Sequence, residues 1–189
     1  MNIKHCCIDL ELEQPHTNLQ TPDSMLNKEK IIQVGYVIYQ LEPEFKVVKK
    51  FSQFVNIGVK LSSFIKNLTK ISDENIASGV TLNEIYEQLV IDQKHYKFSR
   101  VVKQWGGGDV NALKKELPDV KWEFGYSGCN IKHLYQIYAE ANGLNTSGGL
   151  SKCMGRCGVT WEGRGKHDAL IDALNTAKFH SFLYNKLKE

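Results

Sequence analysis

The sequence contains no apolar run long enough to cross a bilayer and no signal-like hydrophobic segment after Met1. Because a membrane-spanning helix needs about 20 consecutive apolar residues, we expect no membrane partner. Internal repeats, low-complexity tracts and an evident linker are also lacking. With 189 residues and 42% hydrophobic content, the sequence predicts one domain over 1–189 with a single good core.

The sequence contains five cysteines, which is an odd number. Together with the missing signal segment, this predicts a reducing, cytoplasmic setting without disulfides. Two pairs, Cys129 with His133 and Cys153 with Cys157, have the ligand types of a structural zinc site, although their spacing fits no common finger pattern. A zinc site stays open as the minor alternative, which metal analysis of the purified protein would test.

Neither sign of charge dominates the sequence. Its 24 basic and 21 acidic residues give a formal net charge of +3 and a pI near 8.5. Such mild basicity permits nucleic-acid binding without indicating it. Basic residues recur over 46–50 and 94–103, where they form either backbone-binding patches or ordinary solvated faces.

The first chemical motif lies in a strand pattern near the N-terminus. Apolar residues at 8, 10 and 12 alternate with Cys7, Asp9 and Glu11, so both carboxylates share one face. Two acids on one face of an apolar strand repel each other and lose hydration unless a cation neutralises them. Hard divalent ions take oxygen ligands. The pattern therefore predicts a metal site, although short Asp-x-Glu strings also occur on solvated edge strands.

The second motif is Trp105-Gly106-Gly107-Gly108-Asp109, between a strand-like run over 98–104 and a helical pattern. Its glycines let the backbone turn sharply and place Asp109 at or near the start of the helix. Asp is also a preferred N-cap residue, so Asp109 is either a ligand or a cap. We reject a phosphate-binding P-loop because no Lys-Ser/Thr pair follows the glycines.

The third motif, over 163–177, opens the longest helical pattern of the chain. At about 3.6 residues per turn, Asp172 falls on the stripe that faces the protein body. His167 lies five positions earlier, which is the wrong angle for one helical face, so we place it on the preceding loop. The simpler interpretations are an exposed loop histidine and a lysine-paired Asp172, and Asp168 is a rival acid that could cap the helix.

The remaining patterns predict an α/β fold with a mixed central sheet between helices. Strands are expected over 3–12, 31–40 and 46–55, with shorter ones near Val101 and Trp122. A turn over 41–44 joins two of them into an antiparallel meander. Helices are expected over 82–93, 110–117, 131–141 and 168–188. The segment 13–29 has no periodicity and leaves directly from the acidic strand, so we expect it to flank the site.

In content and order, the three motifs resemble the DEDD-type 3′-to-5′ exonucleases with a histidine base (DEDDh). The residues of the second and third motifs are most similar to those of the branch that trims RNA 3′ ends. The resemblance covers almost the whole chain and implies a ribonuclease H-like fold, a mixed sheet flanked by helices. Two departures, Leu12 and Asp168, stand where relatives often have small residues. These two departures affect the expected choice of substrate more than the expected catalytic reaction.

The resemblance implies a metal-dependent exonuclease that releases 5′-mononucleotides from single-stranded RNA or DNA with a free 3′ end, with RNA slightly favoured. It implies two Mg²⁺ ions, which Mn²⁺ would replace, and His167 as the general base. The implied metal ligands are Asp9, Glu11, Asp109 and Asp172. The resemblance also implies a contact of Leu12 with the terminal nucleotide, and packing in the core is the alternative interpretation of this residue.

Two alternatives share these residues. A DNA-trimming or proofreading exonuclease would differ only in sugar discrimination, which matched RNA and DNA strands would reveal. A catalytically silent nucleic-acid-binding domain is disfavoured because all five expected residues are present. An endonuclease is disfavoured by the histidine-bearing third motif. The sequence indicates neither the physiological substrate, the protein partners nor the oligomeric state.

Overall fold

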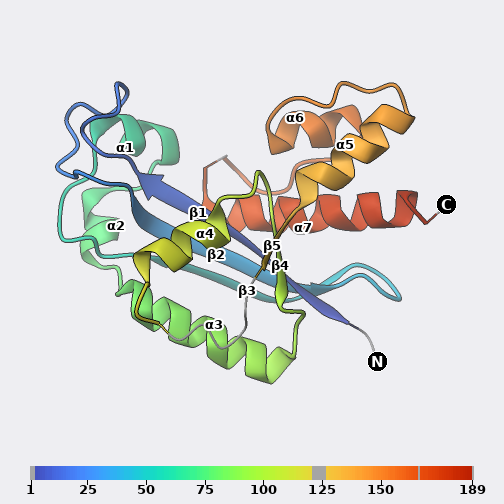
Figure 1. Cartoon of the computed structure of the whole chain (residues 1–189), viewed down its shortest axis with the longest axis horizontal. Coiled ribbons are helices and arrows are strands. Elements are labelled where there is room, and N and C mark those ends of the chain that lie inside the picture. The colour runs from blue at the N-terminus through green and yellow to red at the C-terminus, as the bar shows by residue number, and fades with distance from the viewer. Residues whose placement is uncertain (1–2, 121–126, 166, 189) are drawn as a thin grey trace.

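The computed structural model describes residues 3–120, 127–165 and 167–188, and its centre is a mixed sheet of five strands (Figure 1). The strand order across the sheet is β3-β2-β1-β4-β5. The strands are β1 (Lys4–Glu13), β2 (Lys30–Gln40), β3 (Lys46–Phe54), β4 (Val101–Gln104) and β5 (Ser127–Asn130). The predicted α/β fold with a mixed sheet is therefore confirmed. The strand predicted near Trp122 lies outside the described residues.

Strand pairing places the acidic part of β1 beyond its neighbour β4. The first three strands form the predicted antiparallel meander, whereas β4 pairs in parallel with both β1 and β5. Cys7 of β1 lies opposite Lys103 of β4, and β4 ends one residue later, at Gln104. Asp9 and Glu11 therefore lie past the end of β4 while still paired with β2.

Helices flank the sheet. They are α1 (Ser63–Thr69), α2 (Asp73–Ala77), α3 (Leu82–Tyr96), α4 (Asp109–Glu116), α5 (Ile131–Ala141), α6 (Leu150–Arg156) and α7 (Ala169–Lys186). The four helices predicted by residue number correspond to α3, α4, α5 and α7. The positions of α1, α2 and α6 were not predicted. Among the described residues, no helix is long and apolar enough to span a bilayer.

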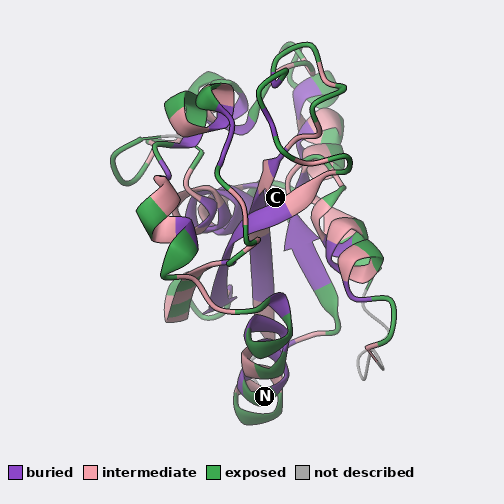
Figure 2. Cartoon of the chain, turned by 90° about the vertical axis from the view of Figure 1, so that its left-hand side faces the viewer, coloured by how far each residue is buried: buried purple, intermediate pink, exposed green. Residues whose placement is uncertain are grey.

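The alternation along β1 distributes its side chains between two apolar layers. Ile8 and Leu10 pack with α3 and α4 on one face of the sheet, whereas Cys7 packs with Leu174 and Ala177 of α7 on the other. The strands β1 and β2 are mostly buried, whereas β3 and β5 are partly exposed, and Figure 2 shows the helices exposed on their outer sides. Because side chains alternate along a strand, Asp9 and Glu11 share the α7 side with Cys7.

A further apolar cluster joins α5, α6 and α7 beside the sheet. Tyr135 of α5, Met154 of α6 and Phe179 of α7 are among its fully buried members. Figure 1 shows α5 and α6 lying against the same side of α7. Cys157, Val159 and Trp161, which follow α6 on the way to α7, also pack against this cluster.

The segment 14–29 between β1 and β2 is irregular, as predicted. It is fastened to α1, because the Asp23 carboxylate accepts a hydrogen bond from the Ser63 amide at 2.8 Å. Two of its apolar side chains, Leu19 and Met25, are exposed. The segment therefore leaves the acidic end of β1 and is held against α1 before it reaches β2.

Candidate active site

Three acids occupy alternate positions at the end of β1, and their surroundings differ. Glu13 is fully buried, and its carboxylate accepts hydrogen bonds from the Ser62 amide at 2.8 Å and the Ser62 hydroxyl at 3.2 Å. Glu13 therefore anchors the N-terminus of α1. Glu11 instead lies beside the Asp172 carboxylate, and repulsion from neighbouring carboxylates contributes to the raised pKa values of both Asp9 and Glu11.

The crowding of acids disfavours their ionisation. Burial, followed by repulsion from Asp109, Asp172 and Glu11, raises the pKa of Asp9 well above its ordinary range. Burial and then repulsion from Asp172 and Asp168 raise the pKa of Glu11 to about 8. Without a cation, the protein at neutral pH cannot keep all these acids ionised without a free-energy cost. A nearby positive charge would reverse these shifts.

Asp109 is the first residue of α4, and it does not cap the helix. The N-cap residue is Gly108, which has no side chain to accept a capping hydrogen bond. The Gln104 side-chain oxygen takes this role by accepting from the Val110 amide at 3.1 Å. The capping interpretation of Asp109 is therefore wrong, and its carboxylate is available for other contacts. No pattern in the sequence predicted this role of Gln104.

The surroundings of Asp109 also favour a neighbouring cation. Burial raises its pKa to about 6, although backbone hydrogen bonds at Asp109 and Leu10 partly oppose the shift. Leu10 belongs to the part of β1 that extends beyond β4, so its amide is free of the β4 ladder. Asp109 therefore lies against the same stretch of β1 that carries Asp9 and Glu11.

The glycines before Asp109 serve the turn, as predicted. Gly106 and Gly107 have φ of 90° and 95°, in the left-handed region that favours glycine. The Gly106 amide donates to the Asn130 side-chain oxygen at 3.0 Å. The turn is thus attached to the end of β5, which holds the start of α4 beside β1.

The start of α7 rests directly on β2. Gly35 lies opposite Asp9 in the strand ladder, and a Cβ atom there would overlap the backbone of Ala169 and Leu170. Two ladder positions away, Gln33 pairs with Glu11, and its side-chain oxygen accepts from the Ala169 amide at 3.1 Å. Sequence reasoning missed both residues, and the available signal was a glycine inside a strand.

The two aspartates of the third motif have different partners. The Asp168 carboxylate accepts from the amides of Leu170 at 3.0 Å and Ile171 at 3.1 Å, so it is the N-cap of α7, as its capping interpretation predicted. Asp172 lies in the first turn of the helix, and its Oδ2 accepts from the backbone amide of His167 at 3.1 Å. Asp168 supports the helix, and Asp172 reaches the acids of β1.

His167 lies on the loop immediately before the N-cap, as predicted, with an exposed side chain. Its φ of 63° is left-handed, which is uncommon for a residue other than glycine. This turn brings the imidazole back over the first turn of α7. Ligand atoms of Glu11, His167 and Asp172 all lie within 4.8 Å of one another.

The donor set fits a hard divalent cation. It comprises the carboxylates of Asp9, Glu11, Asp109 and Asp172 with one imidazole nearby. Mg²⁺ and Mn²⁺ prefer oxygen ligands, and the raised pKa values of the acids show that positive charge would be stabilising here. The first and third motifs, more than 150 positions apart in the sequence, thus meet at one point.

The cysteines have other surroundings. Cys153 is buried, and its thiol donates to the carbonyls of Ser147 at 3.8 Å and Gly148 at 3.6 Å. His133 is hydrogen-bonded to Asn130 at 3.3 Å. Within the described part of the chain, the ligand group that could hold a metal is formed by Glu11, His167 and Asp172.

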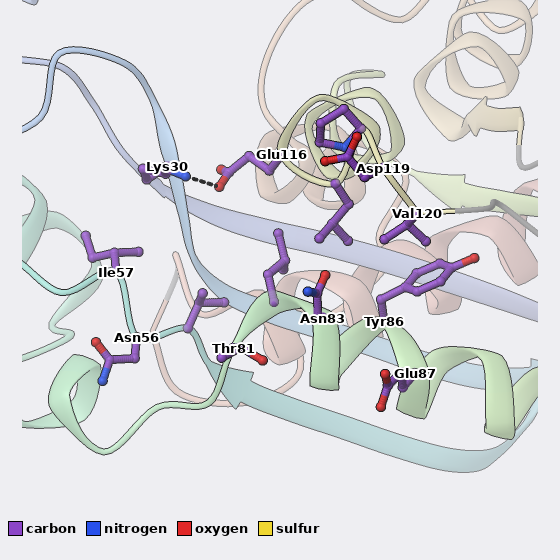
Figure 3. Close-up of a pocket in the computed structure, with 14 residues that line it drawn as sticks. Lys30, Asn56, Ile57, Thr81, Asn83, Tyr86, Glu87, Glu116, Asp119 and Val120 are labelled. Atoms are coloured by element: carbon purple, nitrogen blue, oxygen red, sulfur yellow. Dashed lines mark hydrogen bonds and ion pairs between the residues drawn. The ribbon is translucent and has the colours of Figure 1, made fainter.

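Among the cavities that described residues line, one lies away from the acids and another lies beside them. The larger, about 640 Å³, lies between α3 and the C-terminal end of α4, around the ion pair of Lys30 and Glu116 at 3.1 Å (Figure 3). None of the residues lining it belongs to the acidic cluster. The smaller, about 220 Å³, is lined by His167 and Asp172 together with Trp161 and the start of α6. Only the smaller cavity adjoins the candidate active site.

Leu12 points away from the acids. It is partly buried and packs against the apolar cluster under α3 and α4. This position matches the core interpretation of Leu12, and its contact with a substrate stays a prediction.

Comparison with solved structures defines the fold. The nuclease domain of 3′hExo, a DEDDh family member bound to rAMP, is similar with a TM-score of 0.78 at 20% sequence identity, over 98% of this chain and 93% of that chain. Cell-death related nuclease 4 (CRN-4) is similar with a TM-score of 0.78 at 18% identity, over 97% of this chain and 64% of that chain. No protein-family model matches the sequence, and no curated protein matches it.

The chain therefore has the ribonuclease H-like fold, and it shares this fold with DEDDh nucleases, as the motif resemblance predicted. Exonuclease X, in complex with 5′ overhanging duplex DNA, is a more distant neighbour, with a TM-score of 0.63 at 16% identity over 97% of this chain and 93% of that chain. Against a full-length 3′-exonuclease, this chain spans 61% of the length.

Proposed function

We propose that this protein is a metal-dependent 3′-to-5′ exonuclease that releases 5′-mononucleotides from single-stranded nucleic acid. The observation that carries the proposal is the convergence of Glu11, His167 and Asp172 within 4.8 Å. The Asp109 carboxylate is close enough to Asp9 for their mutual repulsion to raise the pKa of Asp9. The ribonuclease H-like fold shared with DEDDh nucleases supports the same conclusion.

Each acid has a proposed role. Asp9, Glu11 and Asp172 would hold two Mg²⁺ ions, with Asp109 contributing directly or through water, and Mn²⁺ would substitute. Bound divalent cations would supply charge that orients the scissile phosphate, lowers the pKa of water and stabilises the leaving oxygen. A bound cation would offset the repulsion that raises the pKa values of these buried carboxylates, so the acids would ionise fully as the metal binds.

His167 is the proposed general base. Its imidazole is exposed to solvent, so it can take a proton from the attacking water and release it to bulk solvent. The hydrogen bond from its backbone amide to Asp172 ties the imidazole to the helix that carries a proposed metal ligand. This hydrogen bond therefore holds the backbone of the proposed base next to the acid Asp172.

The proposed substrate is a strand with a free 3′ end, with RNA slightly favoured over DNA. The neighbours include a 3′-exonuclease that recognises the 3′ end of a histone mRNA stem-loop and Exonuclease X bound to duplex DNA. The residues of the motifs in this chain are most similar to those of the RNA-trimming branch, which favours RNA as the substrate. We also propose a cytoplasmic location, which the odd number of cysteines supports.

A matched pair of labelled strands tests the proposal. Single-stranded RNA and its DNA counterpart, each labelled at the 5′ end, are incubated with and without Mg²⁺, beside the variant Asp9→Asn. A Mg²⁺-dependent ladder that shortens from the 3′ end, and is absent in the variant, is expected. Binding of either strand in EDTA without cleavage in Mg²⁺ or Mn²⁺ would contradict the proposal and identify a silent binding domain.

A further inference from the structure

The loop that carries His167 is attached to α7 by one buried amide. Asn175 is fully buried, and its side-chain oxygen accepts from the Glu162 amide at 2.9 Å. Its side-chain nitrogen donates to the Glu162 carbonyl at 2.9 Å and to the Ile171 carbonyl at 2.8 Å. A single side chain therefore joins a loop residue and a helix residue.

Only an amide can form this set of bonds. Asn175 accepts from one backbone N–H and donates to two carbonyls, and an amide has both an acceptor oxygen and two N–H donors. A carboxylate of the same shape would face two carbonyl oxygens without a proton. An aliphatic side chain would leave buried backbone groups of Glu162 without a partner, which costs free energy.

The loop has few other fixed points. Residues 157–168 form neither helix nor strand where they are described. The Trp161 indole donates to the Gly165 carbonyl at 3.2 Å, which closes the loop on itself. Lys178 of α7 reaches the Thr160 carbonyl at 3.0 Å and the Glu162 carboxylate at 2.7 Å. The Lys178 contacts are exposed, where such pairs contribute little stability.

The attachment lies on the same helix as Asp172. Asn175 is three residues after Asp172, so it holds the far end of the loop while the His167 amide binds Asp172 at the near end. The short stretch between these two points includes Gly163 and Gly165, with φ of 87° and 91°. Because glycines make this stretch flexible, His167 at its end can hold one position only if Glu162 at its start is fixed.

We propose that Asn175 is a positioning residue that keeps His167 beside Glu11 and Asp172 by anchoring the loop at Glu162. This rests on the proposed function, because the effect of Asn175 on the reaction is exerted through the proposed general base. The hydrogen bonds of Asn175 itself go to the backbone of Glu162 and Ile171 and not to the acids of the site.

A double-mutant cycle tests this role in catalysis. Asn175→Asp, Asn175→Ala and Lys178→Ala are prepared in the wild type and in His167→Ala, and kcat and KM are measured on single-stranded RNA in Mg²⁺. In the wild-type background, both Asn175 variants are expected to lower kcat about 10- to 100-fold, which is no more than the loss expected from removing the general base itself, with KM almost unchanged. In His167→Ala they should cost less than about twofold further.

Lys178→Ala is the matched control, because it removes an exposed tether from the same loop. It should change kcat less than about threefold. An equal loss from Asn175→Ala in both backgrounds would overturn the proposal, since Asn175 would then act through the acids or the fold. Circular dichroism of each variant must show the wild-type helix content.

Hydrogen exchange gives a readout without metal or substrate. The Glu162 amide is hydrogen-bonded to Asn175, so peptides covering 159–168 should exchange faster in both Asn175 variants while peptides of α7 stay protected. Unchanged exchange in this loop would overturn the anchoring role. If the wild type cleaves neither RNA nor DNA, the proposed function fails, and the exchange data alone decide whether Asn175 orders the loop.

Discussion

Gly35 and Ala169 touch through their backbones, because a Cβ atom on Gly35 would overlap Ala169. This contact seats the first turn of α7 on β2, opposite Asp9 in the ladder. The same turn carries the Asp168 cap and Asp172. One glycine thus determines how closely the third motif approaches the first.

Replacing Gly35 by alanine should push the start of α7 away from the sheet. We expect a loss of about 1–3 kcal/mol in the free energy of unfolding, the usual cost of overpacking, and at least a tenfold loss of kcat. Urea denaturation and the RNA cleavage assay measure the two effects. Gly155→Ala is the control, since a Cβ atom there meets open space. Full activity in Gly35→Ala would contradict this role of the contact.

Asp172 and Asp168 should differ sharply in their effect on the reaction. Asp172→Asn is expected to lower kcat at least about 100-fold, because it removes a proposed metal ligand. Asp168→Asn should stay within about threefold of wild type, because asparagine is an equally good N-cap. Both are measured in Mg²⁺ on the same RNA. A large loss in Asp168→Asn with an intact fold would assign that acid to the site as well.

His167→Ala should lower kcat about 10²- to 10⁴-fold, the range that general-base catalysis supplies. Because the imidazole is exposed and its backbone amide makes the bond to Asp172, the substitution should leave the melting temperature nearly unchanged. Single-turnover cleavage separates the chemical step from product release. An unchanged rate in Mg²⁺ would mean that another group accepts the proton.

The acidic cluster should make the metal-free protein less stable as pH rises. The pKa of Glu11 is about 8 in the folded protein against an ordinary 4.5, so the folded state holds this proton more tightly than the unfolded state. Stability therefore falls as pH increases from about 4.5 to about 8. Glu11→Gln should raise the free energy of unfolding at pH 7 by up to about 3 kcal/mol.

Thermal denaturation in EDTA across this pH range measures the effect, and the gain should disappear near pH 4. Mg²⁺ should raise the melting temperature of the wild type more than that of Glu11→Gln, since a cation stabilises the folded state by binding to it. An equal Mg²⁺ effect in both proteins would show that Glu11 does not hold the ion.

The local sequence was sufficient to predict several features. Period-two alternation placed Asp9 and Glu11 on one face of a strand, and helical periodicity assigned Asp172 to the inward stripe of α7. The capping role of Asp168 was a recognised alternative. These features depend on contacts between residues a few positions apart, which are visible in the sequence pattern itself.

The tertiary structure alone decided how the motifs meet. It assigned the capping of α4 to Gln104, which left Asp109 free of that role, and it turned His167 back toward Asp172. It also joined Gln33 to Ala169 across 136 positions. Strand register and the close approach of backbones arise from packing between distant segments, so no local pattern encodes them. The sequence determined which acids face the protein interior, and packing determined that they face one another.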